Sequence, residues 1–418
     1  MSSLLDPDRA EALVREACTP LPPENVASAD AMGRTLARAV TSPVDLPPFH
    51  NSAMDGYALS GGDAPLAAGS EWPVEGEQAA GQGASRAGAG ACWAIMTGAR
   101  LPDGLDRVIP VERTTQLDDP PRVRLEAEVA RWQNIRKAGT DVAGGDTVLA
   151  AGTTLAPQHL MLLAALGIAQ VPVVQRPRVA VLSTGRELVD DPATPLAPGQ
   201  IRDSNGPFLA ERVPRAGAEL VHAESLGDQV KPFLAAIKRA RDAGAQVIVS
   251  TGAVSMGRYD FVPQALEALG ADIVYHKLAV RPGKPQLFAR LSDGTLFFGL
   301  PGNPIATAVG MRFFVERALR VMLGLPRESP WRVPLAAGYA KKPPLRFHLK
   351  SRIGVDAEGR LHATVLPGQQ SYRIRPLADA NGWVVVPVDA RELAAGALVD
   401  VYGLGHLQSP LIPSTWPS

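Results

Sequence analysis

The chain has few of the residues that define secreted, zinc-binding or membrane proteins. Its 418 residues include two cysteines, Cys18 and Cys92, which excludes a disulfide framework and a cysteine zinc site. The seven histidines show no metal-ligand spacing. No apolar run approaches the roughly 18 residues of a membrane span, and the first residues lack a signal pattern. We therefore expect a cytoplasmic protein with no membrane partner.

An excess of charge of either sign is also lacking. Lysine and arginine together number 42, and aspartate and glutamate together number 42 as well. Such a balance gives no global field that would attract nucleic acid or an anionic membrane. Any anion that this protein binds must therefore be held by local groups.

The chain does have enough length for several domains, and its pattern changes along it. At 418 residues it exceeds a single hydrophobic core, so two to four domains are expected. Residues 4–18 and 24–39 are predicted to be helices. Residues 46–139 carry short β-prone segments between glycines and prolines. This pattern predicts an N-terminal mixed domain, 1–45 and 140–173, interrupted by an inserted β domain at 46–139.

Residues 174–327 alternate between strand and helix. Strands are predicted at 178–182, 219–223, 246–250, 272–276 and 296–300, and helices at 204–215, 229–243, 261–269 and 304–323. Alternation at these lengths predicts an α/β domain with a mostly parallel sheet covered by helices on both faces. The short alternating runs of 328–408 are typical of a C-terminal β barrel or sandwich, and 409–418 form a tail. The fold class is therefore multidomain α/β plus β.

Three loops rich in small residues follow strands of the α/β domain. Two end in Ser-Thr-Gly, at 183–185 and 250–252, and the third is Pro-Gly-Asn-Pro at 301–304. Small residues let the backbone approach an anion, and a helix N-terminus presents N–H groups to it. The carboxyl ends of parallel strands meet at one edge, where open α/β sheets bind ligands. We therefore expect one anion site built from three loops.

Three carboxylates occur beside these loops. Glu187, Asp228 and Asp260 stand at or just beyond predicted strand ends. Asp228 and Asp260 could equally cap the helices that follow them. Taken together, three acids around anion loops fit a hard divalent cation with oxygen ligands, and Mg²⁺ is the usual one.

The segment 277–285 contains a cluster of cations. Lys277, Arg281 and Lys284 fall within eight positions. A β-strand would point Lys277 and Arg281 to the same side, because even spacing shares a face. The prolines around Lys284 hold it on a stiff turn. Solvated surface charge is the alternative, but a proline-braced lysine favours a phosphate or another oxyanion as partner.

The motifs, taken in order from about residue 5 to 408, resemble those of MoeA-type molybdopterin molybdenumtransferases, the family that includes the E domain of gephyrin. The matching segments are 51–58 (Asn-Ser-Ala-Met-Asp-Gly-Tyr-Ala), 95–99, 134–141, 151–153, 183–185, 254–260, 282–285, 301–304 and 368–371. The resemblance implies a homodimer of four-domain subunits. The implied reaction inserts molybdate into adenylylated molybdopterin, with Mg²⁺-dependent release of AMP.

The resemblance also assigns roles to individual residues. Asp55, Thr97, Asp141 and Glu187 would be catalytic, and Asp228, Asp260 and Glu187 would bind the metal. Residues far apart in sequence would then meet in a cleft between domains, within or between subunits. The residues implied to bind the cofactor or its anionic groups are Arg136, Ser183, Thr184, Gly185, Gly252, Ser255, Gly257, Lys277, Arg281, Lys284, Pro301, Gly302, Asn303, Ser371 and Arg373.

The sequence departs from the family pattern at two positions. Ala253 stands where the family often has glycine, and a left-handed alanine would cost ~1–2 kcal/mol, so a negative φ is predicted there. Arg186 stands where the family often has aspartate before the glutamate, which weakens the metal role of Glu187.

Two other functions remain open from the sequence. The α/β segment also resembles molybdopterin adenylyltransferases, which make the AMP adduct but lack counterparts of 1–173 and 328–408. Such an adenylyltransferase could also be a partner that supplies the substrate. A molybdopterin-binding scaffold is the third alternative, although this chain has no second catalytic module.

Overall fold

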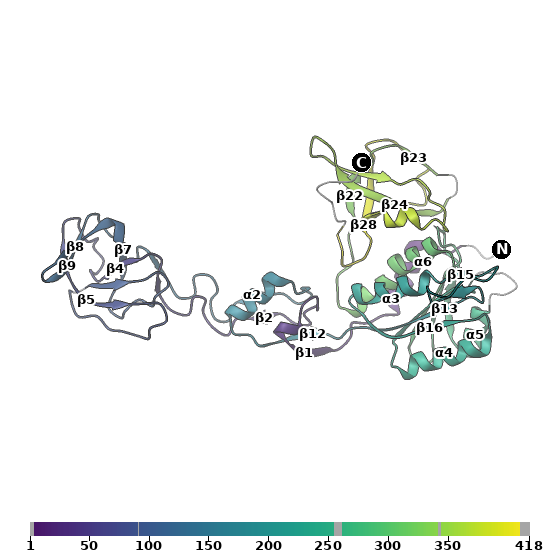
Figure 1. Ribbon diagram of the computed structural model, residues 1–418, viewed down its shortest axis with the longest axis horizontal. Coiled ribbons are helices and arrows are strands. Elements are labelled where there is room, and N and C mark those ends of the chain that lie inside the picture. The colour runs from purple at the N-terminus through teal and green to yellow at the C-terminus, as the bar shows by residue number, and fades with distance from the viewer. Residues whose placement is uncertain (1–3, 91, 255–260, 342–343, 410–418) are drawn as a thin grey trace. The chain divides into compact units, whose positions relative to one another are not determined.

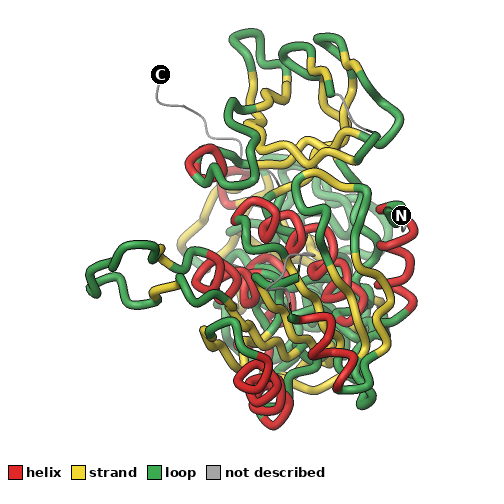
Figure 2. Tube along the Cα trace, turned by 90° about the vertical axis from the view of Figure 1, so that its right-hand side faces the viewer, coloured by secondary structure: helices red, strands yellow, loops and turns green. Residues whose placement is uncertain are grey.

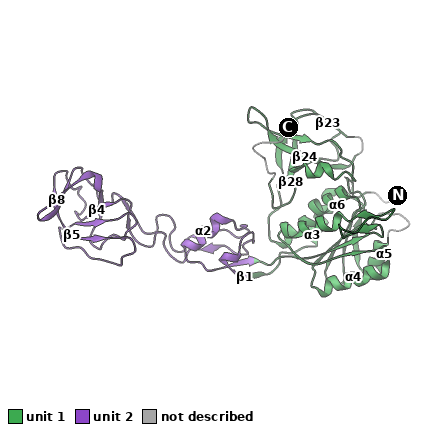
Figure 3. Ribbon diagram, in the orientation of Figure 1, with its two compact units in different colours: residues 1–24, 174–418 green, residues 25–173 purple. Residues whose placement is uncertain are grey.

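The computed structural model describes residues 4–90, 92–254, 261–341 and 344–409 (Figure 1). The chain divides into two compact units, residues 25–173 and residues 1–24 with 174–418 (Figure 3). Three residues with predicted roles, Ser255, Gly257 and Asp260, lie outside the described residues, as does nearly all of the predicted tail. No helix of the described residues is long and apolar enough to cross a membrane.

The larger unit is built on a six-stranded sheet with the order β16-β13-β17-β21-β20-β18. Five strands run in the same direction, and β20 is antiparallel to both of its neighbours. The sheet is thus mostly parallel, as predicted. The sequence pattern did not indicate β20, because four residues after a Pro-Gly-Lys-Pro turn give too short a signal. The strands are β13 (Arg178–Thr184), β16 (Glu219–Leu226), β17 (Val247–Thr251), β18 (Asp272–His276), β20 (Leu287–Arg290) and β21 (Leu296–Leu300).

Helices cover both faces of this sheet (Figures 1 and 2). Alternate residues of β13 point to opposite faces, as a strand requires. Val179 and Val181 pack into one core cluster, and Ala180 and Leu182 into another. The first face carries α1 (Pro7–Glu16), α3 (Asn205–Arg215), α6 (Pro304–Gly310) and α7 (Glu316–Met322), and the second carries α4 (Val230–Asp242) and α5 (Val262–Ala268).

Helix α1 joins this core although its residues lie far from the others in sequence. The Asp6 carboxylate caps it by accepting the N–H groups of Asp8 (2.8 Å) and Arg9 (3.2 Å). Ala10, Val14 and Cys18 are buried in the same cluster as the sheet. Burial raises the pKa of the Cys18 thiol to about 12, so this cysteine is an inert core residue.

Helices α6 and α7 are joined by a π-helical turn, η3 (Met311–Val315), so that a continuous helical segment spans 304–322. Charged residues are buried on it. Arg312 donates to both carboxylate oxygens of Glu328, at 3.0 and 2.6 Å, and to the Gly403 carbonyl at 2.9 Å. Glu316 is fully buried and is paired with Arg212. These ion pairs fix the helical segment to residues far along the chain.

The C-terminal part of the larger unit is a second β sheet, as the short alternating runs predict. Its order is β19-β24-β26-β28-β22, and β25 pairs with β24. Its core contains Val333, Phe347 and Ile353. The elements are β22 (Trp331–Pro334), β23 (Tyr339–Ala340), β24 (Arg346–Val355), β25 (Leu361–Val365), α8 (Arg375–Ala378), β26 (Gly382–Val386), β27 (Glu392–Leu393) and β28 (Leu398–Gly403).

The second unit, residues 25–173, contains another six-stranded sheet with the order β7-β4-β6-β5-β9-β8. Its strands are β4 (Gly56–Leu59), β5 (Glu71–Gln78), β6 (Cys92–Ile95), β7 (Arg107–Pro110), β8 (Thr114–Asp118) and β9 (Pro121–Leu125), with the 3₁₀ turn η2 (Val111–Arg113) between β7 and β8. The remaining elements are η1 (Ser28–Asp30), β2 (Val40–Thr41), β3 (Asn51–Ser52), β10 (Ile135–Arg136), β11 (Thr147–Leu149), α2 (Pro157–Ala165) and β12 (Gln170–Val174).

The predicted helix at 24–39 is wrong. Residues there form β1 (Pro23–Ala27), which pairs with β12, and the 3₁₀ turn η1. Exposed and half-buried residues alternate along β1, so its period is that of a strand. Gly33 then adopts a φ of 71°, which an α-helix does not allow. The polar residues of 28–30 begin a short turn and not a helix.

Candidate functional site

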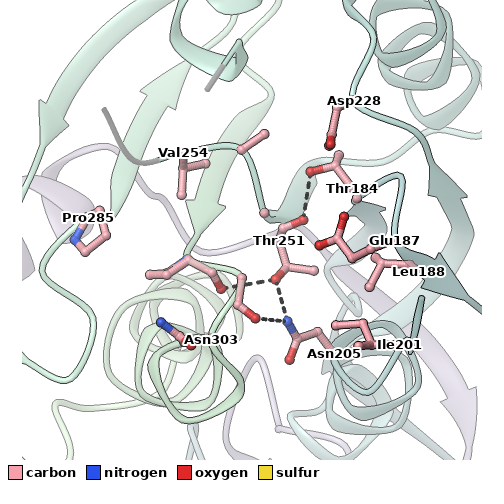
Figure 4. A pocket seen from close by; sticks show the side chains of 15 residues that line it. Thr184, Glu187, Leu188, Ile201, Asn205, Asp228, Thr251, Val254, Pro285 and Asn303 are labelled. Atoms are coloured by element: carbon pink, nitrogen blue, oxygen red, sulfur yellow. Dashed lines mark hydrogen bonds between the residues drawn. The ribbon is translucent and has the colours of Figure 1, made fainter. Parts of the chain in front are cut away.

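A pocket of about 310 Å³ lies at the carboxyl ends of β13, β17 and β21. Its walls come from the three small-residue loops that the sequence singled out (Figure 4). The lining residues are Thr184, Gly185, Glu187, Leu188, Ile201, Asn205, Asp228, Thr251, Gly252, Ala253, Val254, Pro285, Pro301, Gly302 and Asn303. Leu188 belongs to β14 (Leu188–Val189), which pairs with β15 (Ile201–Arg202).

Hydrogen bonds join the loops to one another (Figure 4). The Thr184 hydroxyl donates to the Thr251 carbonyl at 3.1 Å, and the Thr251 hydroxyl donates to the Pro301 carbonyl at 3.2 Å. Asn205 donates to the Thr251 hydroxyl at 3.0 Å and to the Gly302 carbonyl at 2.8 Å. The floor of the pocket is therefore fixed in shape before any ligand binds.

Asn205 was not among the predicted site residues. It begins α3, and the Asp203 carboxylate accepts its N–H at 2.9 Å and that of Gly206 at 3.0 Å. The polar sequence Asp-Ser-Asn-Gly at 203–206 is the signal that could have identified it. Such a polar run before a helix usually indicates only a cap. The structure uses it to direct an amide at two of the three loops.

Gly252 is required by the geometry of the pocket. Its φ is 96°, and a Cβ there would lie 2.3 Å from the Thr184 carbonyl oxygen. Only a glycine therefore lets this loop pack so closely against the backbone of the Thr184 loop. The prediction for the next residue is wrong, since Ala253 has a φ of 49°. The chain must reverse between β17 and α5, and two successive left-handed residues make that reversal.

Two carboxylates, Glu187 and Asp228, line the pocket on the same side of the view, opposite Pro285 and Asn303 (Figure 4). Asp228 does not cap α4, whose N-cap residue is Gln229 and has no side-chain cap bond. The Asp228 carboxylate accepts the N–H of Arg186 at 3.4 Å instead. Within the described ranges, no three acids, histidines or cysteines are grouped to hold a metal ion.

Ser183, which was predicted to bind the cofactor, does not line the pocket. It is buried, with 1% of its surface exposed. A Cβ on Gly206 would lie 2.7 Å from its hydroxyl oxygen, so Ser183 packs behind α3. The pocket surface nearby is formed by Thr184 and Gly185.

The predicted cations of 277–285 do not share a strand face, so that expectation is wrong. Strand β18 ends at His276, Lys277 has a φ of 119°, and Arg281 belongs to a separate strand, β19 (Val280–Arg281). Strand β19 pairs with β24 of the C-terminal sheet. The turn of Lys284 is held by its carbonyl, which accepts the Leu278 N–H at 2.9 Å.

Arg281 lines a second cavity of about 260 Å³. Its guanidinium lies 5.3 Å from the centre of the Phe347 ring, and the Lys341 ammonium lies 5.3 Å from the same ring. Gln369 and Gln370 complete one wall. The segment 277–285 therefore contributes to both cavities, with Pro285 in the first and Arg281 in the second.

The predicted residues of the last β segment approach the first pocket through the backbone. The Ser371 carbonyl accepts the N–H of Ile305 at 3.0 Å, in the first turn of α6. Asn303, which precedes this helix, lines the pocket. Arg373 is exposed in the same loop, and its N–H donates to the Gln370 carbonyl at 3.2 Å.

The other predicted residues belong to the unit of residues 25–173. Asp55 accepts the backbone N–H of Thr97 at 2.6 Å and the Thr97 hydroxyl at 2.9 Å. The backbone bond first, and the hydroxyl bond second, lower the pKa of the Asp55 carboxyl. Arg136 lies in β10 opposite Asn51, and the Asp141 N–H donates to the Leu46 carbonyl at 3.0 Å. The structure thus joins Asp55 with Thr97 directly.

Comparison with known families first shows the class of protein to which the α/β domain belongs. Residues 180–321, which contain the three loops, match the family described as "Probable molybdopterin binding domain". The two flanking segments define the particular family. Residues 5–167 match "MoeA N-terminal region (domain I and II)", and residues 332–404 match "MoeA C-terminal region (domain IV)". The chain belongs to the MoeA-type molybdopterin molybdenumtransferase family, and it is an enzyme of the transferase class.

Similar proteins extend over the whole chain. Proteins named molybdopterin molybdenumtransferase from Synechococcus elongatus and Bacillus subtilis are 36% and 34% identical to it, covering 94% and 90% of this chain and 97% and 89% of their own. Molybdopterin molybdenumtransferase 2 of Mycobacterium tuberculosis is 37% identical over 97% of this chain and 100% of its own. The solved molybdopterin biosynthesis MoeA protein of Pyrococcus horikoshii is 27% identical, with a TM-score of 0.80 over 96% of this chain and 99% of its own.

Proposed function

We propose that this enzyme inserts molybdenum from molybdate into adenylylated molybdopterin and releases AMP. The dithiolene sulfurs of the pterin replace oxygen ligands of molybdate, which leave as water. Water adds to the anhydride bond between the two phosphates, so that AMP and the pterin phosphate separate. The observation that carries the proposal is the pocket at β13, β17 and β21, in a chain whose three segments all match MoeA regions.

The pocket is suited to a phosphate or another oxyanion. Its lining includes Gly185, Gly252 and Gly302, which carry no side chains, and the loop ahead of α6 leads into a helix N-terminus. The bonds from Asn205 hold these loops in place, so little reorganisation is needed on binding. Lys284 and Arg281 are proposed to bind anionic groups of the substrates from the adjoining segment.

The carboxylates of the pocket fit a divalent cation of the Mg²⁺ type. Glu187 and Asp228 supply oxygen ligands, which Mg²⁺ prefers, and substrate phosphates and water would complete its shell. When bound, Mg²⁺ would neutralise charge on the departing phosphate. Asp260, the third proposed ligand, lies outside the described residues.

Asp55, Thr97 and Asp141 are proposed to act in the same reaction from the unit of residues 25–173. The support for this is the ordered Asp55–Thr97 pair, whose two hydrogen bonds go to the charged form of the carboxyl and lower its pKa. A charged carboxylate suits a base or an orienting group, and not a proton donor.

The deciding experiment measures AMP release from adenylylated molybdopterin, with and without molybdate and Mg²⁺. We expect release that needs both. Addition of AMP to free molybdopterin from ATP would instead indicate an adenylyltransferase, and binding of the pterin without either reaction would indicate a scaffold. The matches of 5–167 and 332–404 to MoeA regions disfavour the adenylyltransferase.

Two substitutions test the residues of the pocket. Glu187→Gln and Asp228→Asn keep the shape of each side chain and remove its charge. We expect each to raise the Mg²⁺ concentration needed for half-maximal AMP release, because a carboxylate binds a hard cation better than an amide. Asp242→Asn, at the exposed end of α4, is the control. An unchanged Mg²⁺ requirement in both pocket variants would contradict the metal role.

We further propose that the protein is a cytoplasmic homodimer, as the family resemblance implies. Light scattering coupled to gel filtration would test the dimer, and a mass of one 44.1 kDa chain would contradict it.

A further inference from the structure

Lys350 is a buried cation held by the backbone of one loop. It lies in the middle of β24 and has 0% of its surface exposed. Its ammonium donates to the carbonyls of Gly368 at 2.7 Å and Arg373 at 3.0 Å, and a third carbonyl, that of Gln370, lies at 3.5 Å. Within the described part of the chain it forms no ion pair. A buried charge is costly unless it is hydrogen-bonded, so these carbonyls are what make its position tenable.

The loop of residues 366–373 depends on this contact for its shape. None of its residues belongs to a hydrophobic core cluster among the described residues, and most of them are half-buried or exposed. Its hydrogen bonds to β24 are made by the Lys350 ammonium, by the Gln369 amide and by the Leu366 N–H, which donates to the Lys350 carbonyl at 3.0 Å. The Gln369 amide accepts the Lys350 N–H at 3.0 Å and donates to the Lys350 carbonyl at 2.9 Å. The loop is therefore fastened to β24 by polar contacts at a single residue.

The same loop supports the wall of the first pocket. Its Ser371 carbonyl accepts the Ile305 N–H, one of the helix-initiating groups of α6 that need an acceptor outside the helix. Asn303 and Gly302, just before this helix, line the pocket. On the other side, Gln369 and Gln370 line the cavity of Arg281. A displacement of the loop would thus disturb both cavities.

We propose that Lys350 is a positioning residue that fixes the loop 366–373, and through Ser371 the pocket loop 301–303, in the arrangement that binds the anionic substrates. The effect on substrate binding rests on the proposed function, whereas the positioning of the two loops by Lys350 does not. Burial, and secondarily the nearby Arg373, lower the pKa of the Lys350 ammonium to about 8, so most molecules carry the charge at neutral pH.

The test is Lys350→Met, which keeps the length of the side chain and removes its donors. Hydrogen–deuterium exchange should be about tenfold faster at the amides of 366–373 and 301–306, because each lost bond to a buried group leaves it without a partner. AMP release should show a raised KM for molybdate with a smaller change in kcat, as expected for lost binding geometry. Lys350→Gln, a shorter donor, should fall between the wild type and Lys350→Met, and serves if the methionine variant does not fold.

Asn381→Leu is the matched control. It removes two hydrogen bonds to Ile353 in the same strand, at 2.7 and 2.8 Å, without touching the loop. It should lower Tm but leave the exchange of 366–373 and the KM for molybdate unchanged. Wild-type exchange at 301–306 in Lys350→Met would overturn the inference. Absence of AMP release in the wild-type enzyme would overturn the proposed function, and the exchange data would still decide the role of Lys350.

Discussion

At the scale of single residues, we expect a side-chain methyl group to lower the stability of the protein at positions 252 and 253, but to very different extents. Ala253→Gly should raise Tm, with a gain in the free energy of unfolding of up to about 1 kcal/mol, because glycine adopts a φ of 49° without strain. The gain is limited by the packing of the lost methyl group against the second core cluster. Thermal unfolding measures the shift. A Tm clearly below that of the wild type would contradict the expectation.

Gly252→Ala is the reverse case in the same loop. The added Cβ would meet the Thr184 carbonyl oxygen at 2.3 Å, which is backbone and cannot move aside cheaply. We expect a loss of several kcal/mol or a displaced loop. AMP release should fall strongly even at temperatures where the variant is folded. Normal activity in a folded variant would show that the close packing of Gly252 against the Thr184 backbone is not needed for the reaction.

The Asp55 carboxylate makes one part of the protein sensitive to acid. Its pKa is lowered in the folded protein, so its contribution to stability is present above the unfolded pKa and is lost as the pH falls through the lower folded value. Tm should therefore fall as the pH drops below about 4, the ordinary pKa of an aspartate. Asp55→Asn should start with a lower Tm at neutral pH and lose less of it on acidification. Asp118→Asn, at the exposed end of β8, should follow the wild type.

Individual residues also show the limits of reading a sequence. The loops at 183–185, 250–252 and 301–303 could be identified because small residues directly after an apolar strand expose the backbone to a ligand. The conformation of Ala253 could not be predicted. Alanine strongly prefers a negative φ, but the reversal of the chain at this point imposes a positive one. Asn205 was missed because its role depends on loops 46 and 97 residues away.

At the scale of elements, the buried ion pairs of the helical segment 304–322 are the most sensitive feature. Arg312→Met removes the ion pair with Glu328. It also removes the positive charge that lies 3.7 Å from the Glu316 carboxylate. Removing one partner of a buried pair costs ~3–5 kcal/mol, so a large fall in stability is expected. Denaturant unfolding measures it. Arg332→Met, whose partner Asp400 is partly exposed, should cost less than ~1 kcal/mol.

The double variant Arg312→Met with Glu328→Gln provides the corresponding check. If the loss in the single variant comes from an uncompensated carboxylate, removing that charge should restore part of the stability. Strictly additive losses would instead assign the effect to packing of the arginine side chain.

Elements with a strong period were the most predictable. Strands with continuous apolar runs, such as β17 and β21, and the long helical segment 304–322 follow their patterns closely. The helix expected at 24–39 failed because its few apolar residues satisfy either period, and pairing with β12 decided between them. The β19 strand could not be foreseen, since a two-residue element exists only through its partner, β24.

At the scale of the whole molecule, the division into two units predicts its unfolding behaviour. Each unit has core clusters of its own. Calorimetry should therefore resolve more than one transition. Asp55→Asn should shift the transition of residues 25–173, and Arg312→Met that of the other unit. A single transition moved equally by both substitutions would contradict independent unfolding.

The packing of α1 has a consequence for folding during synthesis, because the residues that bury this helix come much later in the chain. Ala10 and Val14 belong to a core whose later members extend from Val179 to Val385, so this helix is synthesised long before the residues that bury it. Residues 25–173 are contiguous and can fold while the rest is being synthesised. During that time the apolar face of α1 has no partner. A nascent chain of this protein would therefore expose the helix to chaperones until the sheet that receives it has been made.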